Sequence, residues 1–363
     1  MNLALSDEQE FLREAARGAL SRVKTVEAAR DALEGGDLPD LWPLACEAGW
    51  PGLLISEQHG GAGLGAFDAM LVLGECGRVL AGVPLLGHLP ATAILDAAGA
   101  DGLAELASGA KRAAFVAARP PSSDEEGWTV EPRTGHARVA APTMDANGRL
   151  HGEVAFVPDA PGADVLVVIC ADGQAVVVDG SSASVEAATC YDATRSIGHV
   201  RFDGAPATVL QGEDHAASAW YLAHALIAAE SVGSVETALE LSVAYAKERF
   251  TFGRAIGSYQ AVKHALVEVL RRMENARSLL YYAGWAYADK TDEFPLAASA
   301  ARSAAGRAFD FAARELISVH GGIGATWEHD APLYFRRSQL SRRLLGGTAD
   351  ATDRVAGEML AAA

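Results

Sequence analysis

The chain has 363 residues, of which 50% are hydrophobic and 21% are charged, and its formal net charge at pH 7 is −17. This length and composition indicate a folded protein with more than one lobe and exclude an intrinsically disordered chain. The strongly acidic balance argues against nucleic acid and anionic membranes as partners, because both repel negative charge.

The cysteines and the N-terminal segment indicate the compartment. Cys46, Cys76, Cys170 and Cys190 form no Cys-x-x-Cys pair, so we expect reduced thiols, no disulfide framework and no metal site. The segment MNLALSDEQEF has no basic region followed by a long apolar core, and no stretch reaches the length of a membrane span. We therefore expect a soluble, cytoplasmic protein.

The first part of the chain, 1–111, is predicted to be a helical domain. Ser6 and Gln9 have the spacing of a capping box, and the amphipathic helix that follows is expected to bury Phe11. The glycine-rich run at 59–63 is interpreted as a loop between helices. No strand pattern precedes this run and no lysine follows it, as a phosphate-binding loop would require.

From 112 to 213 the pattern changes to short apolar or alternating runs that turn residues separate. Such runs predict strands, and here they occur at 113–117, 163–170, 175–178 and 199–202. We interpret this part as a middle β-domain, either a sandwich or a barrel.

Helical periodicity returns in 214–363. Long amphipathic segments predict helices at 216–247, 259–289, 295–319 and 348–360, which together suggest a four-helix bundle. The expected fold class is therefore α+β, with an N-terminal helical domain, a middle β-domain and a C-terminal four-helix bundle.

The segment between the first two of these helices has residues that favour a binding role. It is 245–264 and reads YAKERFTFGRAIGSYQAVKH. Arg249 can donate two hydrogen bonds to a phosphate, Phe252 can lie along an aromatic ring, and Gly253 allows a close approach of the backbone. A lone Gln260 precedes the next helix. The alternative is an ordinary corner between two helices.

Three segments, in this order, resemble motifs of the acyl-CoA dehydrogenase family. Its N-terminal helical signature is similar to LWPLACEAGWPGLLISEQHGGAGLGAFDAMLVLGECGR, its Arg-x-x-Phe-Gly…Gln segment to ERFTFGRAIGSYQAVKH, and its Gly-Gly-x-Gly segment to SVHGGIGATWEHDAPLYFRR. The resemblance covers nearly the whole chain. It implies FAD bound in clefts between subunits, oxidation of an acyl-CoA thioester at its α and β carbons, and an electron-transfer flavoprotein as the usual acceptor.

The resemblance also implies which residues bind the cofactor. The hairpin arginine and phenylalanine would meet the pyrophosphate side of FAD, the glutamine would meet neighbouring polar groups, and three glycines would approach the adenosine from an adjacent subunit. The implied cofactor-binding residues are Arg249, Phe252, Gln260, Gly321, Gly322, Gly324 and Thr348.

The parts that would hold the flavin ring and the catalytic base depart from the family. The flavin-contacting Thr-Glu-Pro-x-x-Gly-Ser-Asp loop is reduced to Ser123-Asp124, and Phe156 stands near the place of a tryptophan. The position of the usual glutamate base is occupied by Gly346, and the second position that some members use corresponds to Ala223. By this resemblance, the β-domain is not expected to hold a flavin by itself.

Glu230 is the carboxylate that could replace the missing base. It lies in an apolar segment two helical turns after Ala223, on the same face. Two turns displace it by about 10 Å from the position of Ala223. This displacement is large for a proton transfer, which needs near-contact. The alternative role of Glu230 is a buried hydrogen bond or ion pair between helices.

The chain keeps the residues implied to bind the adenosine and pyrophosphate of FAD but lacks the catalytic base. In this it resembles one branch of the family, found in bacterial steroid degradation. There, two homologous subunits form a heterotetramer with fewer active sites than subunits. Our hypothesis is that this chain is one such subunit, that its partner supplies the glutamate and the flavin pocket, and that the acyl group is bulky. Two alternatives stay open: a self-sufficient homotetramer with a relocated base, and a non-catalytic scaffold or acyl-CoA-binding homologue.

Overall fold

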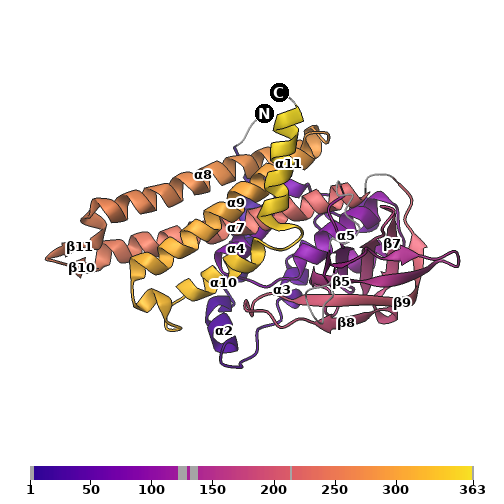
Figure 1. Cartoon of the computed structure of the whole chain (residues 1–363), viewed down its shortest axis with the longest axis horizontal. Coiled ribbons are helices and arrows are strands. Elements are labelled where there is room, and N and C mark those ends of the chain that lie inside the picture. Colours follow the sequence, from indigo (N-terminus) through magenta and orange to yellow (C-terminus); the bar gives the residue numbers. More distant parts are fainter. Residues whose placement is uncertain (1–3, 122–128, 131–137, 213–214, 362–363) are drawn as a thin grey trace.

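A computed structural model describes residues 4–121, 129–130, 138–212 and 215–361. N-terminal helices, a middle sheet and long C-terminal helices follow one another, which confirms the predicted fold class (Figure 1). The sheet lies at one end of the molecule and the long helices extend away from it. None of the helices in the described ranges is long and apolar enough to cross a membrane. These ranges also contain no group of three potential metal ligands.

The N-terminal helices are α1 (Asp7–Leu20), α2 (Thr25–Ala32), α3 (Trp42–Glu47), α4 (Ala66–Arg78), α5 (Leu85–Ala97) and α6 (Leu103–Ala107). The predicted capping box starts α1: the backbone N–H of Gln9 donates to Ser6 Oγ at 3.2 Å, and Ser6 N–H donates to Gln9 Oε1 at 3.1 Å. The prediction that Phe11 is buried is wrong, because its side chain is 73% exposed. The buried side of α1 instead carries Ala16 and Leu20.

The middle part contains β1 (Ala113–Ala117), β2 (Thr129–Val130), β3 (Arg138–Val139), β4 (Thr143–Met144), β5 (Arg149–Pro158), β6 (Val165–Ile169), β7 (Ala175–Asp179), β8 (Ser184–Ala187) and β9 (Ile197–Val209). Seven of these strands form a mixed sheet in the order β1-β6-β7-β9-β5-β4, with β8 also on β9. Among the strand pairs of the described residues, only β1 and β6 are parallel. The sequence motif Ser123-Asp124 lies outside the described residues.

The two halves of this sheet share one core. Strand β9 pairs with β5 over 197–206, with β8 over 198–201 and with β7 through its last three residues, 207–209. Alternate residues such as Val116 in β1, Val168 in β6 and Phe202 in β9 belong to one apolar cluster. The opposite face of β1, with Phe115, packs into the main core with the helices. Strand β1 is therefore buried on both faces, and it carries the sheet against the helices.

The C-terminal helices are α7 (His215–Glu248), α8 (Gln260–Asp289), α9 (Phe294–His320), α10 (Ala331–Ser341) and α11 (Gly347–Ala361). A short hairpin of β10 (Phe250–Thr251) and β11 (Arg254–Ala255) joins α7 to α8 and projects at the end of the molecule opposite the sheet (Figure 1). With 34 residues, α7 is about 50 Å long. It therefore connects the sheet end of the molecule to the hairpin end.

Glycines let α7 lie close to α4. A Cβ atom on Gly233 of α7 would fall 1.9 Å from the carbonyl oxygen of Gly74, and one on Gly77 of α4 would fall 1.9 Å from that of Glu230. Any larger side chain at these positions would push the two helices apart. This close crossing fixes the segment of α7 that carries Glu230.

Candidate functional site

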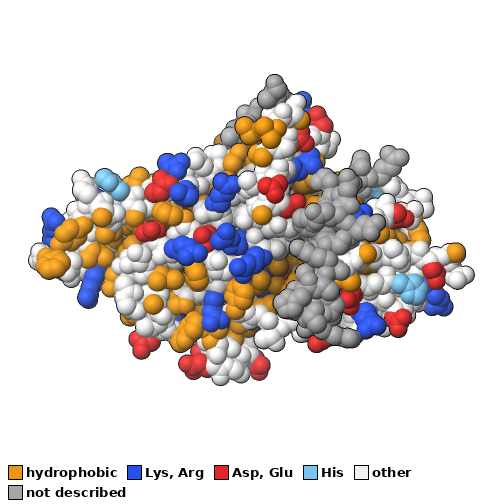
Figure 2. Space-filling view, in the orientation of Figure 1, with side chains coloured by type: hydrophobic (Ala, Val, Ile, Leu, Met, Phe, Trp, Pro, Cys, Tyr) orange, Lys and Arg blue, Asp and Glu red, His pale blue; other side chains and the backbone are white. Residues whose placement is uncertain are grey.

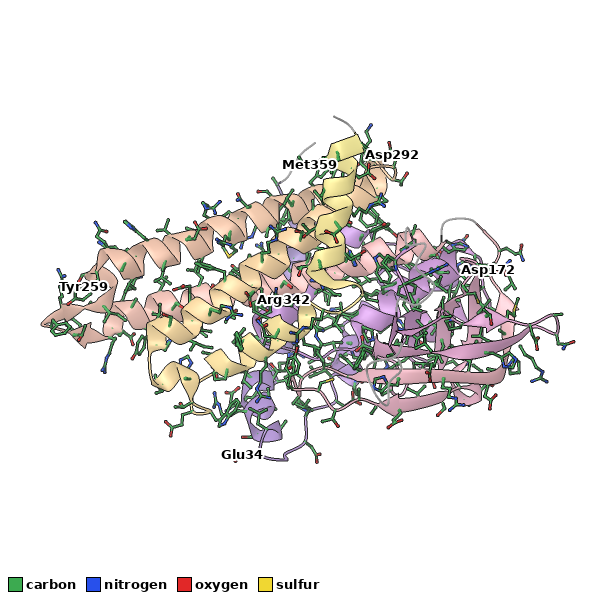
Figure 3. The ribbon with its side chains drawn as sticks, in the orientation of Figure 1. Glu34, Asp172, Tyr259, Asp292, Arg342 and Met359 are labelled. Atoms are coloured by element: carbon green, nitrogen blue, oxygen red, sulfur yellow. The ribbon has the colours of Figure 1, made fainter. Side chains whose placement is uncertain are left out.

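A cavity of about 460 Å³ lies between the sheet and the C-terminal helices. Its walls come from the end of β1, from β5, from the start of α7 and from the segment that follows α10. Figure 3 labels Arg342, the first residue of that segment. The cavity is lined by Phe115, Ala117, Ala118, Ala155, Phe156, Val157, Pro158, Tyr191, Trp220, Leu340, Arg343, Leu344, Leu345 and Gly346. Among these described residues, Arg343 has the only charged side chain.

A bulge in β5 places Phe156 at this cavity. The pairing of β5 with β9 shifts register between Val154 and Val157, which leaves two residues opposite His199. Phe156 has a φ of 58° and is 48% exposed, and its ring meets that of His199 edge to face at 4.8 Å. Because a bulge redirects side chains out of the regular alternation, the aromatic ring reaches the cavity mouth.

The segment before Gly346 is held by two buried side chains that sequence reasoning did not single out as functional. Arg302 of α9 donates from Nη2 to the Leu344 carbonyl at 3.3 Å, and His224 of α7 donates from Nε2 to the Leu345 carbonyl at 2.8 Å. Burial lowers the pKa of Arg302 to about 9 and that of His224 to about 3. His224 is therefore neutral near pH 7, and the cavity wall beside it is fixed.

Asp350 occupies the space next to Gly346. A Cβ atom on Gly346 would lie 3.0 Å from Oδ2 of Asp350. Burial and the nearby Asp353 raise the pKa of Asp350 to about 6. A half-buried carboxyl that titrates near neutral pH has the chemistry of a general base, although Asp350 does not line the cavity.

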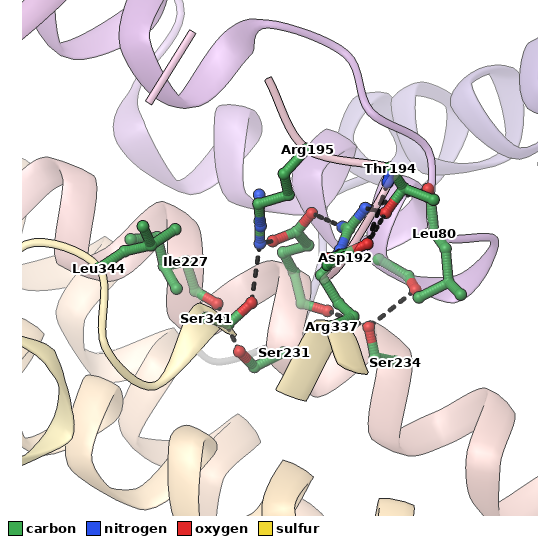
Figure 4. Close-up of polar contacts among 12 residues, drawn as sticks. Leu80, Asp192, Thr194, Arg195, Ile227, Ser231, Ser234, Arg337, Ser341 and Leu344 are labelled. Carbon is green, nitrogen blue, oxygen red and sulfur yellow. Dashed lines mark hydrogen bonds and ion pairs between the residues drawn. The ribbon is translucent and has the colours of Figure 1, made fainter. Parts of the chain in front are cut away.

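Glu230 lies in a buried ion-pair cluster with Arg195, Arg337 and Asp192. Figure 4 labels the two arginines and Asp192. Its two carboxylate oxygens accept hydrogen bonds from Arg195 and Arg337, and Arg337 also donates to Asp192 at 2.8 Å and to the Leu80 carbonyl at 3.1 Å. Burial raises the pKa of Asp192, but the two guanidinium groups outweigh burial and hold this pKa below its usual value. Glu230 does not line the cavity, so its surroundings favour an ion pair. Its role as base stays a prediction.

The hairpin between α7 and α8 presents Phe252 to solvent. Thr251 pairs with Arg254, so Phe252 and Gly253 are the two central residues of the turn. Their φ angles are 51° and 77°, as in the turns that prefer Asn-Gly. Phe252 is 94% exposed. A bulky aromatic residue in this left-handed conformation is strained, and nothing in the described chain covers it.

Arg249 and Gln260 flank this hairpin. Arg249 is exposed, and within the described ranges its guanidinium forms no ion pair. Gln260 is the first residue of α8, whose N-cap residue, Tyr259, provides no side-chain hydrogen bond. Free N–H groups at the start of a long helix attract anions. The hairpin base therefore offers an arginine and a helix N-terminus to a negatively charged group.

The three predicted glycines after α9 differ in what the fold demands of them. Gly321 has a φ of 65°, and a Cβ atom on Gly324 would lie 2.6 Å from the Ile317 carbonyl oxygen. Gly322 has an ordinary φ of −52°, and a Cβ atom there would meet nothing within 4 Å. The backbone conformation at Gly321 and the close contact at Gly324 therefore explain why these two positions carry glycine. Nothing within the described chain requires glycine at position 322.

Thr348 lies apart from the other six predicted cofactor residues. The hairpin and the glycine segment share one end of the helices, where the ring of Tyr245 lies 4.2 Å from that of His320. Thr348 lies near Gly346 at the cavity, and its Cγ2 packs where a Cβ atom on Gly306 would fall. From Trp220 at the cavity to the end of α7 the distance is about 40 Å. One chain does not bring Thr348 and the other six residues to one ligand.

Comparison with known proteins was made on sequence and on structure. Residues 6–105 match the N-terminal domain of acyl-CoA dehydrogenases, and residues 211–360 match the C-terminal domain. The chain belongs to the acyl-CoA dehydrogenase family. This confirms the family and the enzyme class, an acyl-CoA dehydrogenase oxidoreductase, that the sequence motifs predicted.

Individual relatives cover the whole chain. Acyl-CoA dehydrogenase IpdE2 of Mycolicibacterium smegmatis is 33% identical over 98% of the chain and 100% of its own length, and IpdE2 of Mycobacterium tuberculosis is 33% identical over 97% and 98%. The Tcur3481–Tcur3483 steroid acyl-CoA dehydrogenase superimposes with a TM-score of 0.84 at 27% identity, over 98% of each chain. The ChsE4–ChsE5 complex of Mycobacterium tuberculosis has the same fold, with a TM-score of 0.83 at 24% identity and 99% coverage of each chain.

Proposed function

We propose that this chain is one subunit of a heteromeric, FAD-dependent acyl-CoA dehydrogenase that oxidises an acyl-CoA thioester to the α,β-enoyl-CoA. The observation that carries the proposal is that the described lining of the cavity contains no carboxylate, so a subunit of different sequence would have to supply the base. The cavity and the hairpin lie about 40 Å apart along α7, so both can contact one dinucleotide only if different subunits contribute them. A solved relative that carries two subunit names and is described as a steroid enzyme supports a pair of homologous subunits.

The hairpin end has the groups that the adenosine and pyrophosphate arm of FAD requires. Arg249 and the N-terminus of α8 would bind the pyrophosphate, since both favour negative charge. The exposed Phe252 ring would pack against a flat group of the partner subunit or cofactor. Open space above Gly322 would let the adenosine approach the backbone. FAD bound there supplies the two-electron acceptor for the substrate hydrogen.

Oxidation of the acyl group also needs a carboxylate to remove the α-proton. The described lining of the cavity contains no carboxylate, and Gly346 stands at the place of the usual base. Both oxygens of Glu230 accept from arginines. The partner subunit would therefore provide the base, and this chain would orient the shared cofactor and help to exclude water from it. An electron-transfer flavoprotein would be the acceptor.

Asp350 favours a second candidate function, a self-sufficient homomeric dehydrogenase. Its carboxyl lies beside Gly346, so a shift of the segment around Gly346 would bring it to the cavity. Its pKa is raised to about 6, which suits a base near neutral pH. In that case an Asp350→Asn variant of the lone chain would lose nearly all activity, as Glu230→Gln would if Glu230 were the base. A heteromeric enzyme would keep its activity when only Asp350 is changed.

Co-expression with a homologous subunit tests the proposal. We expect the two chains to elute together with bound flavin, and we expect Arg249→Ala to reduce the flavin content of the complex at least about fivefold, because a charge-assisted contact with the pyrophosphate is lost. Arg314→Ala is the matched control, since Arg314 is exposed and pairs with Asp310 of its own helix. Unchanged flavin content in the Arg249→Ala complex would contradict the proposed role of the hairpin.

A further inference from the structure

Arg302 of α9 is a fully buried cation that has no carboxylate partner within the described ranges. It is 0% exposed. Its Nη2 donates to the backbone carbonyls of Ser341 and Leu344, whereas its Nε and Nη1 are buried and have no hydrogen-bond partner among the described residues. An unpaired N–H of a buried charged group is costly. Arg302 therefore favours any state of the chain that brings an anion to it.

Asp350 of α11 is a carboxyl group without a partner of its own. It is half-buried, and within the described ranges its side chain forms neither an ion pair nor a hydrogen bond. Burial and the neighbouring Asp353 raise its pKa to about 6, while Arg354 of the same helix and Arg302 of α9 act in the opposite direction. Arg302 and Asp350 therefore already influence each other's charge, but their side chains do not touch.

The free Nη1 atom of Arg302 lies beside the first turn of α11. A Cβ atom on Gly306, one turn further along α9, would fall 3.7 Å from this Nη1 and 2.1 Å from Cγ2 of Thr348. Thr348 is the second residue of α11, and Asp350 is the fourth. A small movement of this turn would therefore carry the carboxyl of Asp350 relative to the guanidinium.

The residues where α11 begins can act as a hinge. Leu345, Gly346 and Gly347 have φ angles of 49°, 74° and 72°, so three successive residues are left-handed. Glycine adopts this conformation readily, whereas leucine is strained in it. Rotation at the two glycines would redirect the first turn of α11, in the way that a few residues at the end of an element absorb most hinge motions.

We propose that Arg302 and Asp350 form a buried ion pair in a second state of the chain, the latched state, which the hinge at Gly346 and Gly347 allows. Arg302 can keep its Nη2 bonds to the two carbonyls while Nη1 binds the carboxylate. Gly346 lines the cavity, so latching reshapes the cavity wall. The inference concerns the conformation of this chain alone and does not depend on which subunit binds the flavin.

Protonation of Asp350 controls the latched state. Only the ionised carboxyl pairs with Arg302, and in the structure this carboxyl ionises near pH 6. Raising the pH through about 6 therefore favours latching, and lowering the pH reverses it. Two other groups near α11 keep their charge state in this range. Arg307 of α9 donates to Thr352 and stays charged, and His224 of α7, whose pKa burial lowers to about 3, stays neutral.

Fluorine NMR of the full-length chain labelled with 5-fluorotryptophan tests the pH dependence. Trp220 lines the cavity, and its ring lies 5.4 Å from that of His224, which holds the Leu345 carbonyl. Trp220→Phe identifies its signal among the six tryptophans. We expect this signal to titrate between about pH 5 and about pH 6.5.

Two matched variants assign the titration. In Asp350→Asn the Trp220 signal should no longer titrate, because the carboxyl is gone. In Asp353→Asn it should still titrate, at a lower pH, because only the neighbouring like charge is removed. A Trp220 signal that is constant with pH in the parent chain, or that titrates unchanged in Asp350→Asn, would overturn the latched state.

A double-mutant cycle measures the ion pair itself. Urea unfolding of the parent, Arg302→Met, Asp350→Asn and the double variant gives the coupling between the two side chains. At pH 8 we expect a coupling of at least about tenfold in the unfolding equilibrium constant, and a smaller factor at pH 5, where protonation of the carboxyl competes with the pair. A coupling below about twofold at pH 8 would refute the pair. If Arg302→Met does not fold, the fluorine signal of Asp350→Asn still decides, because this change nearly preserves the shape of the side chain.

Discussion

We predict that Phe252 lowers the stability of the lone chain and contributes to assembly of the complex with the partner subunit. Its backbone lies in the left-handed region, with a φ of 51°, and its ring is 94% exposed. Holding a bulky residue there costs about 1 kcal/mol or more, whereas asparagine adopts this conformation readily. Almost no buried apolar area is lost on substitution. We therefore expect Phe252→Asn to raise the free energy of unfolding of the lone chain by about 1 kcal/mol, and to lower the flavin content of the co-expressed complex.

Urea denaturation of the lone chain, followed by circular dichroism, measures the first effect. Phe11→Asn is the matched control: Phe11 is 73% exposed but lies in α1, where asparagine is the poorer or equal helix former, so no stabilisation is expected. The absorption of bound flavin in the purified complex measures the second effect. A Phe252→Asn chain that is less stable than the parent would show that the turn is not strained and that Phe252 packs within its own chain.

Three further predictions concern the buried charges, pH and the glycine segment. Glu230→Gln should lower the free energy of unfolding by about 3 kcal/mol, because it leaves buried arginines with one partner fewer; a fully stable but inactive variant would instead identify Glu230 as the base. Burial lowers the pKa of His88 to about 4 and that of His224 to about 3, so below about pH 6.5 the unfolded chain binds protons that the folded chain does not. Urea titrations at several pH values should therefore show stability falling between pH 6.5 and 4, by about 3 kcal/mol for each histidine, and constant stability would contradict their neutral burial. Gly324→Ala should destabilise the lone chain, whereas Gly322→Ala should leave its unfolding midpoint unchanged and reduce flavin binding in the complex; unchanged flavin content would remove Gly322 from the site.

The sequence predicted the elements whose patterns are regular. The expected strand at 113–117 is β1, and the expected helix at 259–289 agrees with α8 within one residue. Strand β5 was missed, because Gly152 and the register shifts interrupt its alternation. Helix α10 was missed as well, since the buried Arg337 breaks the apolar periodicity that normally marks a helix. The domain limits, at 111 and 213, stay a prediction.

The candidate site also combines parts that a local sequence pattern can indicate with parts that only the fold brings together. The hairpin with Arg249 and Phe252 is local in sequence, so the spacing of its residues predicts a binding role, and this role stays a prediction. The cavity combines residues from β1 to Gly346, and no local pattern connects them. Arg302 could have been found as a charge on the buried side of an alanine-rich helix, because such a charge needs partners. The space that Asp350 takes beside Gly346 depends on the packing of α11, which sequence reasoning does not reach.

The most direct test of the proposed heteromeric enzyme is the visible absorption spectrum of this chain, first purified alone and then co-expressed with a homologous subunit. We predict no flavin band for the lone chain, and a flavin band of one FAD per pair of subunits when the two chains elute together. A full flavin band from the lone chain, with oxidation of an acyl-CoA, would contradict the shared site. It would make Asp350 and Glu230 the residues to replace next.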